Sequence, residues 1–197
     1  MLLAFVYIIY SLLFLVFLGV VIRKRKDFSF RENAVSGLGI SKSPHAKVFN
    51  LVLMAYGILS MLFALLFKDY LPPNISSDLL VMFFLAAGFM SVFVGLLPFD
   101  KYLIPHLVAA EGAFAFIFLA SVVMIPVNLQ TEWIWDWMLV INFVVVFGSL
   151  KLLYHSARHK LTGDWGRSAW LSEWVMFIVV LVSNLLFGVM LLVEMGL

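Results

Sequence analysis

The sequence contains no cysteine and very little charge. Of its 197 residues, 12% are Asp, Glu, Lys or Arg, and 64% are hydrophobic. The absence of cysteine excludes disulfide bonds, thiolate metal sites and cysteine nucleophiles. Soluble domains are about 25% charged and about 45–50% apolar, so this composition excludes an ordinary soluble domain. It indicates an integral membrane protein.

Long apolar runs dominate the chain and do not alternate with polar residues. Runs such as LLFLVFLGVVI and FIVVLVSNLLFGVMLL lack the alternation of a membrane β-barrel strand. One helical crossing needs about 20 apolar residues, so the chain has room for six helices and no separate soluble domain. We predict an all-α, polytopic integral membrane protein: a six-transmembrane-helix bundle that forms a single domain over residues 1–197. The predicted spans are about 1–22, 46–67, 79–97, 106–127, 136–155 and 169–194.

The first apolar run is predicted to be an uncleaved helix. Residues 1–22 carry no charge and are followed by four consecutive basic residues, Arg23, Lys24, Arg25 and Lys26. A secretory signal has its positive charges before the apolar run and a small-residue cleavage site after it. Here the order is reversed, and the run is long enough to span a membrane.

Basic residues are concentrated in alternate connections between the predicted spans. Counting flanking residues, all of the 13 Lys and Arg except Lys68 fall in the first, third and fifth connections. Connections rich in Lys and Arg stay in the cytoplasm. We therefore predict a cell-membrane protein with both termini outside and with loops 23–45, 98–105 and 156–168 in the cytoplasm.

The six tryptophans lie in two clusters near predicted span ends. One cluster covers 133–137, before the fifth span, and the other covers 165–174, around the start of the sixth. Indole rings favour the headgroup level of a bilayer. The clusters should therefore mark the outer and inner interfaces respectively.

Small residues recur every four positions in the third and fourth spans. Ala87, Ser91 and Gly95 form one such stripe, and Ala109 and Ala113 form another. Small side chains let helix backbones approach closely in lipid. We expect these two helices to form a tight antiparallel pair.

The first connection leads into a polar segment, residues 33–50, which reads NAVSGLGISKSPHAKVFN. Gly37 and Gly39 allow backbone turns that other residues resist, and the serine hydroxyls can satisfy exposed backbone groups. We predict that the polar segment folds back over the cytoplasmic mouth of the bundle instead of hanging free.

Two phrases in the chain resemble a known membrane family. FSFRENAVSGLG followed by SPHAKVFNLVLMAYGILSMLFALL is similar to the phrase N-x-x-S-x-L-G and a helix opening with F-N in the prokaryotic six-helix proteins of domain of unknown function 998 (DUF998). GLLPFDKYLIPH resembles that family's G-x-x-P-x-D with a downstream histidine. Through these features the chain is also distantly similar to the FRAG/DRAM/SFK group of eukaryotic membrane proteins, some of which are linked to lipid remodelling. The resemblance covers roughly residues 28–120.

The resemblance implies a fold but no established activity. Family members often carry an acidic residue between the serine and the leucine of the first phrase, where this chain has Gly37. If that carboxylate serves a reaction, its absence counts against an enzymatic role here. The matching positions are Asn33, Ser36, Leu38, Gly39, Phe49, Asn50, Pro98, Asp100 and His106.

A candidate polar site follows from these two phrases. We expect the polar segment to pack against the 98–106 connection. The two phrases are far apart in the sequence, and one physical reason for both to be present is that they form a single polar mouth together. Ser36 with His106 and Asp100 has the residue types of a nucleophilic set, although serines in glycine-rich loops are common. No metal-ligand spacing is present, so we predict no metal and no cofactor. The candidate site consists of Asn33, Ser36, His45, Asp100, His106 and Glu111.

Several polar residues fall inside predicted spans. Glu111 lies about five residues into the fourth span, roughly 7.5 Å below its start. A carboxyl group at that depth is a functional candidate by default; the alternative is a structural Glu paired with a neighbouring helix, for which Lys151 is the expected partner. Amides inside spans usually cross-link helices, with cavity lining as the alternative. The amides concerned are Asn50, Asn142 and Asn184.

Three classes of function fit these observations. The basic run 23–26 is expected to contact anionic lipid at about 1 kcal/mol per residue, unless it serves only as a topology signal. We favour a non-catalytic protein that binds membrane lipids or a membrane-protein partner, as in a larger complex, and no nucleic acid. An intramembrane lipid-modifying enzyme with a polar site at the cytoplasmic mouth is the alternative, and a small-solute transporter ranks third. A polar cavity at Glu111, Asp100 and His106 would favour the enzyme.

Overall fold

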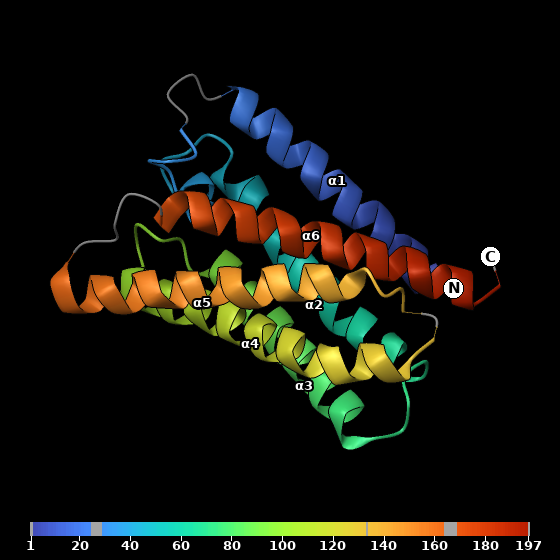
Figure 1. Ribbon diagram of the computed structural model, residues 1–197. Helices are drawn as coiled ribbons and strands as arrows, with labels where there is room; N and C mark the ends of the chain where they lie inside the picture. Colours follow the sequence, from blue (N-terminus) through green and yellow to red (C-terminus); the bar gives the residue numbers. More distant parts are fainter. Residues whose placement is uncertain (1, 25–28, 133, 164–168, 197) are drawn as a thin grey trace.

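Six long helices make up the computed structural model, which describes residues 2–24, 29–132, 134–163 and 169–196 (Figure 1). Each helix is long and apolar enough to cross a membrane. No strand occurs in these ranges, and the predicted all-α, six-helix membrane bundle is confirmed. The helices are α1 (Leu2–Lys24), α2 (Ala46–Lys68), α3 (Ile75–Leu96), α4 (Leu103–Gln130), α5 (Met138–Thr162) and α6 (Ala169–Glu194).

Helix ends differ from the predicted spans where local signals outweigh hydropathy. α3 begins directly after Asn74, whose side chain caps it by accepting a hydrogen bond from the N–H of Ser77 at 2.9 Å. α5 continues to Thr162 and stops at Gly163, which has a left-handed φ of 72° and closes the last turn. Hydropathy marks where a chain leaves the membrane, and a helix can continue beyond that level.

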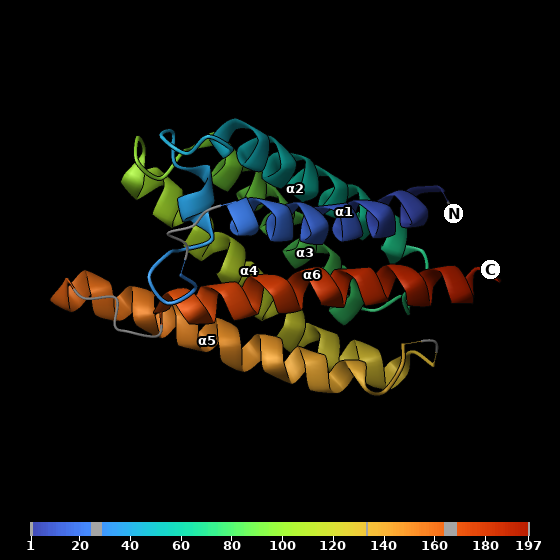
Figure 2. The same ribbon diagram turned by 90° about the horizontal axis from the view of Figure 1, so that it is seen from above.

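The helices form a closed ring in chain order. Each helix packs against the next, and α1 packs against α6, which completes the ring. Figures 1 and 2 show α6 between α1 and α5. The start of α1 and the end of α6 lie at one end of the ring, and the polar segment lies at the other. The inward faces of the six helices therefore share one interior.

The most extensive helix–helix packing is that of α3 against α2 and α4. A Cβ atom on Gly57 of α2 would lie 2.6 Å from the carbonyl oxygen of Gly88 in α3, and one on Gly95 would lie 2.7 Å from the carbonyl oxygen of Asn50. Both distances are too short for real atoms, so glycine permits this backbone approach. The expected pairing of the third and fourth spans is present, but Gly95 serves the contact with α2 instead.

The buried apolar side chains of the ring interior form two clusters. One lies towards the start of α1 and contains Phe67 and Leu80, both almost fully buried. The other contains Phe14 of α1 together with Val35 and Leu38, which belong to the polar segment. The polar segment is therefore part of the folded core.

Candidate functional site

The polar segment crosses the end of the ring instead of extending away from it. Its centre is a single 3-10 turn, η1 (Ser36–Gly39). Leu38 is fully buried, and Val35 is 4% exposed. These two apolar side chains hold the segment against the bundle and leave its polar atoms to form hydrogen bonds with the helices.

Two of these hydrogen bonds reach backbone carbonyls of the polar segment. The indole Nε1–H of Trp174 in α6 donates to the carbonyl oxygen of Asn33 at 2.7 Å. The side-chain Nδ2–H of Asn50 in α2 donates to the carbonyl oxygen of Gly39 at 3.0 Å. The segment is thus attached to helices on two sides of the ring.

A third attachment joins the polar segment to the connection between α3 and α4. The carboxylate of Asp100 accepts the backbone N–H of Ser41 at 2.8 Å and also accepts the Ser41 hydroxyl. These hydrogen bonds, from the side chain first and then the backbone, hold the pKa of the Asp100 carboxyl below its ordinary value of 3.8. The expected contact with the 98–106 connection is present at this pair.

A fourth attachment comes from Glu173 in α6. Its carboxylate lies near the backbone N–H groups of Val35 and Ser36, at the start of η1. Sequence reasoning missed this residue, although an acidic residue inside the sixth predicted span was a visible signal. A carboxylate therefore does reach this part of the polar segment. It comes from α6, whereas members of the resembling family often carry an acidic residue at the position of Gly37.

The two glycines of η1 have different structural roles. Neither has a positive φ, so the expected use of glycine for an unusual turn is wrong. A Cβ atom on Gly39 would overlap the side chain of Asn50 and lie 3.1 Å from Cδ1 of Phe49, whereas one on Gly37 would meet nothing within 4 Å. Gly39 is needed for close approach to α2.

Beneath the polar segment lies a cavity of about 70 Å³, here called the mouth cavity. Of the candidate polar site, Ser36, His106 and Glu111 line it together. Asn33, His45 and Asp100 do not line it. Its other polar lining residues are His155, Ser156, Trp170 and Glu173.

His106 is held by the connection that precedes its helix. The ring is 3% exposed, and its Nδ1 lies 2.6 Å from the carbonyl oxygen of Leu97. Phe99 packs edge-on against the imidazole, with 5.5 Å between ring centroids. In the expected nucleophilic set, Asp100 would hold the ring of His106. The Leu97 carbonyl does so instead, and Asp100 is hydrogen-bonded to Ser41.

Glu111 is paired, but not with the expected partner. Its carboxylate accepts the hydroxyl of Ser156 and forms an ion pair with Lys160 at 2.6 Å. Lys151 is exposed on α5 instead. The sequence-based pairing is wrong because α5 extends beyond the predicted span and brings Lys160 to the level of Glu111. In the described ranges, no three His, Asp or Glu side chains are grouped as metal ligands.

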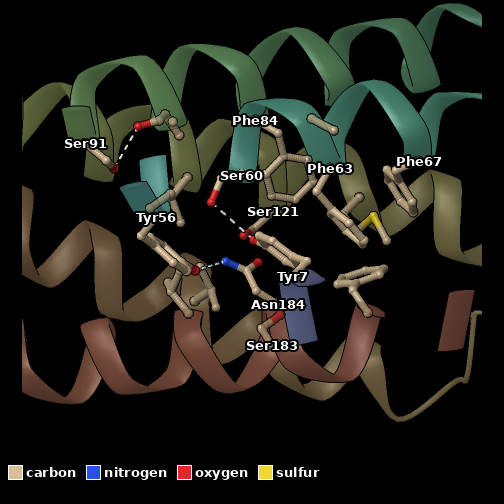
Figure 3. A pocket seen from close by; sticks show the side chains of 18 of the residues that line it. Tyr7, Tyr56, Ser60, Phe63, Phe67, Phe84, Ser91, Ser121, Ser183 and Asn184 are labelled. Carbon is tan, nitrogen blue, oxygen red and sulfur yellow. Dashed lines mark hydrogen bonds between the residues drawn. The ribbon is translucent and has the colours of Figure 1, made fainter. Parts of the chain in front are cut away.

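Two further cavities continue from the mouth cavity into the ring. The middle cavity, also about 70 Å³, shares Ser36, Ala110, Phe114 and Glu173 with the mouth cavity and is otherwise mostly apolar. The central cavity, about 60 Å³, shares Tyr56 with the middle cavity (Figure 3). Polar side chains in the cavity walls are therefore concentrated at the mouth and at the centre, with fewer of them in between.

Hydroxyl and amide groups surround the central cavity. The hydroxyls of Tyr7 and Ser60 are 3.2 Å apart, and Asn184 donates to the hydroxyl of Tyr56 (Figure 3). Asn142 is 3% exposed, and its Nδ2 has no hydrogen-bond partner among the described residues. Asn184 thus links α6 to α2, and both asparagines line a cavity. Asn50 instead binds the polar segment.

The basic run and the tryptophan clusters are only partly described. Arg23 and Lys24 end α1 and are exposed, whereas Arg25 and Lys26 lie outside the described residues. Trp133 and Trp165 are also outside them. Trp174 is 1% exposed and attaches the polar segment, so its indole ring is covered by protein.

A closed ring of membrane-crossing helices, with a cavity partly lined by polar side chains at one end, defines a multi-pass membrane protein. The chain belongs to the family described as Protein of unknown function (DUF998), whose model matches residues 8–190. This match runs from α1 to α6 and confirms the family that the two phrases suggested. Neither a curated protein nor a solved structure matches the chain.

Proposed function

We propose that this protein binds the end of a membrane lipid in the mouth cavity without transforming it. The observation that carries the proposal is a cavity with several polar side chains in its wall, beneath the polar segment, that continues into a cavity with a more apolar wall. An amphiphile presents the same succession, a polar group followed by hydrocarbon. With about 70 Å³ in each cavity, only the end of the molecule enters, and the rest stays in the bilayer.

Charge at the same end of the ring supports this function. We propose that the end of α1, with Arg23 and Lys24, faces the cytoplasmic leaflet of the cell membrane and attracts anionic headgroups. The termini then lie outside, and residues 1–197 act as a single domain. The resemblance to the FRAG/DRAM/SFK group, some of whose members are linked to lipid remodelling, is consistent with a lipid ligand.

A phenylalanine placed in the cavity wall tests the proposal. Ala110 lines both the mouth and the middle cavity, so Ala110→Phe should fill the space and reduce the lipid that co-purifies with the protein, as measured by mass spectrometry. Val108→Phe is the matched control, because Val108 is 61% exposed on the same helix. Equal lipid content in both variants and the original protein contradicts binding in the cavity. The same preparation reveals any co-purifying protein partner.

A lipid-modifying enzyme is the second candidate, because Ser36 and His106 line the same cavity. A serine nucleophile with a histidine base is the arrangement of acyl-transfer enzymes. If the protein hydrolyses lipid, Ser36→Ala should abolish turnover of a labelled lipid extract and leave lipid co-purification intact. Absence of turnover by the original protein supports the binding function instead.

A further inference from the structure

The hydrogen-bonding state of His106 restricts what the mouth cavity can bind. The Nδ1 atom lies 2.6 Å from the carbonyl oxygen of Leu97. A carbonyl oxygen only accepts hydrogen bonds, so Nδ1 carries the hydrogen. In the neutral imidazole, Nε2 then holds a lone pair and acts as an acceptor.

This acceptor has no partner in the described part of the chain. Nε2 of His106 is buried and makes no hydrogen bond there. Buried polar atoms in native proteins are almost always paired with protein or with a bound molecule. Since the ring lines the mouth cavity, the occupant of that cavity is the group that can supply the donor.

The other charged groups around the mouth cavity already have donors. Glu111 accepts from Ser156 and Lys160, and Glu173 lies near two backbone N–H groups of the polar segment. No Lys or Arg belongs to the described lining of the cavity. A phosphate would therefore meet two carboxylates without a cation of its own, whereas a neutral donor meets an unused lone pair.

We propose that the mouth cavity binds a neutral, hydroxyl-bearing end of a membrane lipid, whose hydroxyl donates to Nε2 of His106. This inference rests on the proposed function and names its ligand class. The hydroxyl carbon occupies the mouth cavity, and the next carbons extend along Phe114, which lines both the mouth and the middle cavity. The anionic headgroups attracted by Arg23 and Lys24 stay at the membrane surface.

Three lipids that differ only at the end group test the inference. The purified full chain, in lipid nanodiscs, is titrated with 1,2-dioleoylglycerol, with its 3-methyl ether and with dioleoyl phosphatidate. The hydroxyl should make dioleoylglycerol bind about tenfold more tightly than the methyl ether, which is the usual effect of one hydrogen bond to a buried acceptor. Phosphatidate should bind no more tightly than the ether. In ¹⁵N-histidine spectra, the Nε2 resonance of His106 should move with dioleoylglycerol alone.

A matched pair of histidine variants assigns the effect to one atom. His106→Asn retains an N–H donor for the Leu97 carbonyl but lacks the Nε2 acceptor, so it should lose the tenfold preference and still bind the methyl ether. His45→Asn changes a histidine outside the cavity and should keep the preference.

Each other outcome has a distinct meaning. Equal binding of dioleoylglycerol and its methyl ether leaves lipid binding intact and overturns the hydroxyl inference, as does tighter binding of phosphatidate. An Nε2 resonance that is the same with and without dioleoylglycerol shows that the lipid hydroxyl does not donate to this atom and also overturns the hydroxyl inference. Failure of all three lipids to bind overturns the proposed function as well.

Discussion

The carboxylate of Asp100 accepts hydrogen bonds from both the backbone N–H and the hydroxyl of Ser41, a residue 59 positions earlier in the chain. The pair closes the polar segment onto the connection between α3 and α4. Both hydrogen bonds favour the ionised carboxylate, which is why they lower its pKa. Attachment of the polar segment should therefore depend on pH in a predictable direction.

Acid should release Ser41. Because the folded pKa of Asp100 is below the ordinary value of 3.8, its stabilising effect is fully present above that value and is lost as pH falls through the lower folded pKa. Amide hydrogen exchange at Ser41, relative to its intrinsic rate, should rise over this range. Asp100→Asn should raise the exchange at neutral pH and abolish its acid dependence. Unchanged protection in this variant would show that other contacts hold the segment.

Alanine should lower stability at only one of the two glycines of η1. Gly39→Ala displaces Asn50, which donates to the Gly39 carbonyl, and should lower the free energy of unfolding by roughly 1–3 kcal/mol. Gly37→Ala meets open space and should be neutral or stabilising by up to about 1 kcal/mol. Thermal unfolding in detergent measures both. Equal changes in stability would mean that the close approach to α2 does not restrict the size of the residue at position 39.

The two partners of Glu111 should differ in importance. Lys160 is 62% exposed, so Lys160→Gln should cost less than about 1 kcal/mol of unfolding free energy. Ser156 is 6% exposed and donates to a carboxylate, so Ser156→Ala should cost about 1.5–3 kcal/mol. Lys47→Gln, at an exposed position, is the control for loss of a positive charge. The reverse order would identify the ion pair as the main stabilising contact.

The orientation in the membrane can be tested with single cysteines, because the chain has none. Lys42→Cys places a thiol on the polar segment, and Ser76→Cys places one in the first turn of α3, at the opposite end of the ring. In intact cells, an impermeant thiol reagent should label position 76 and spare position 42. Labelling of position 42 alone would reverse the proposed topology and remove the cytoplasmic leaflet as the source of anionic lipid.

Hydropathy was sufficient to predict six helices, because the energetic cost of unpaired backbone in lipid leaves few alternatives to a helix. It could not predict the end of α5, since the residues up to Thr162 are helical but polar, and this error led to the wrong partner for Glu111. The order of the helices around the ring could not be predicted from the sequence either. It depends on contacts such as Gly57 with Gly88, which are visible only once two helices are placed together.

The candidate site was predicted in part, for a physical reason. Ser36 and His106 could both be assigned to the candidate site because each belongs to a recognisable phrase. That they line the same cavity depends on the fold. Glu173 was missed because its partners are backbone N–H groups, which have no signature in sequence. Trp174 was assigned to the lipid headgroups because its type is common there, whereas its hydrogen bond to Asn33 depends on how the polar segment returns to the bundle.

The contact between α1 and α6 has a consequence for how this protein is assembled. A ring that is closed by α1 and α6 cannot be completed before α6 has been synthesised, because α6 is the last of the six helices to leave the ribosome. Until then the future interior is open to the bilayer on one side, and hydrocarbon chains solvate it. The arrival of α6 then closes the ring around the end of any lipid that lies there, so the first ligand can enter during assembly, before the ring is complete.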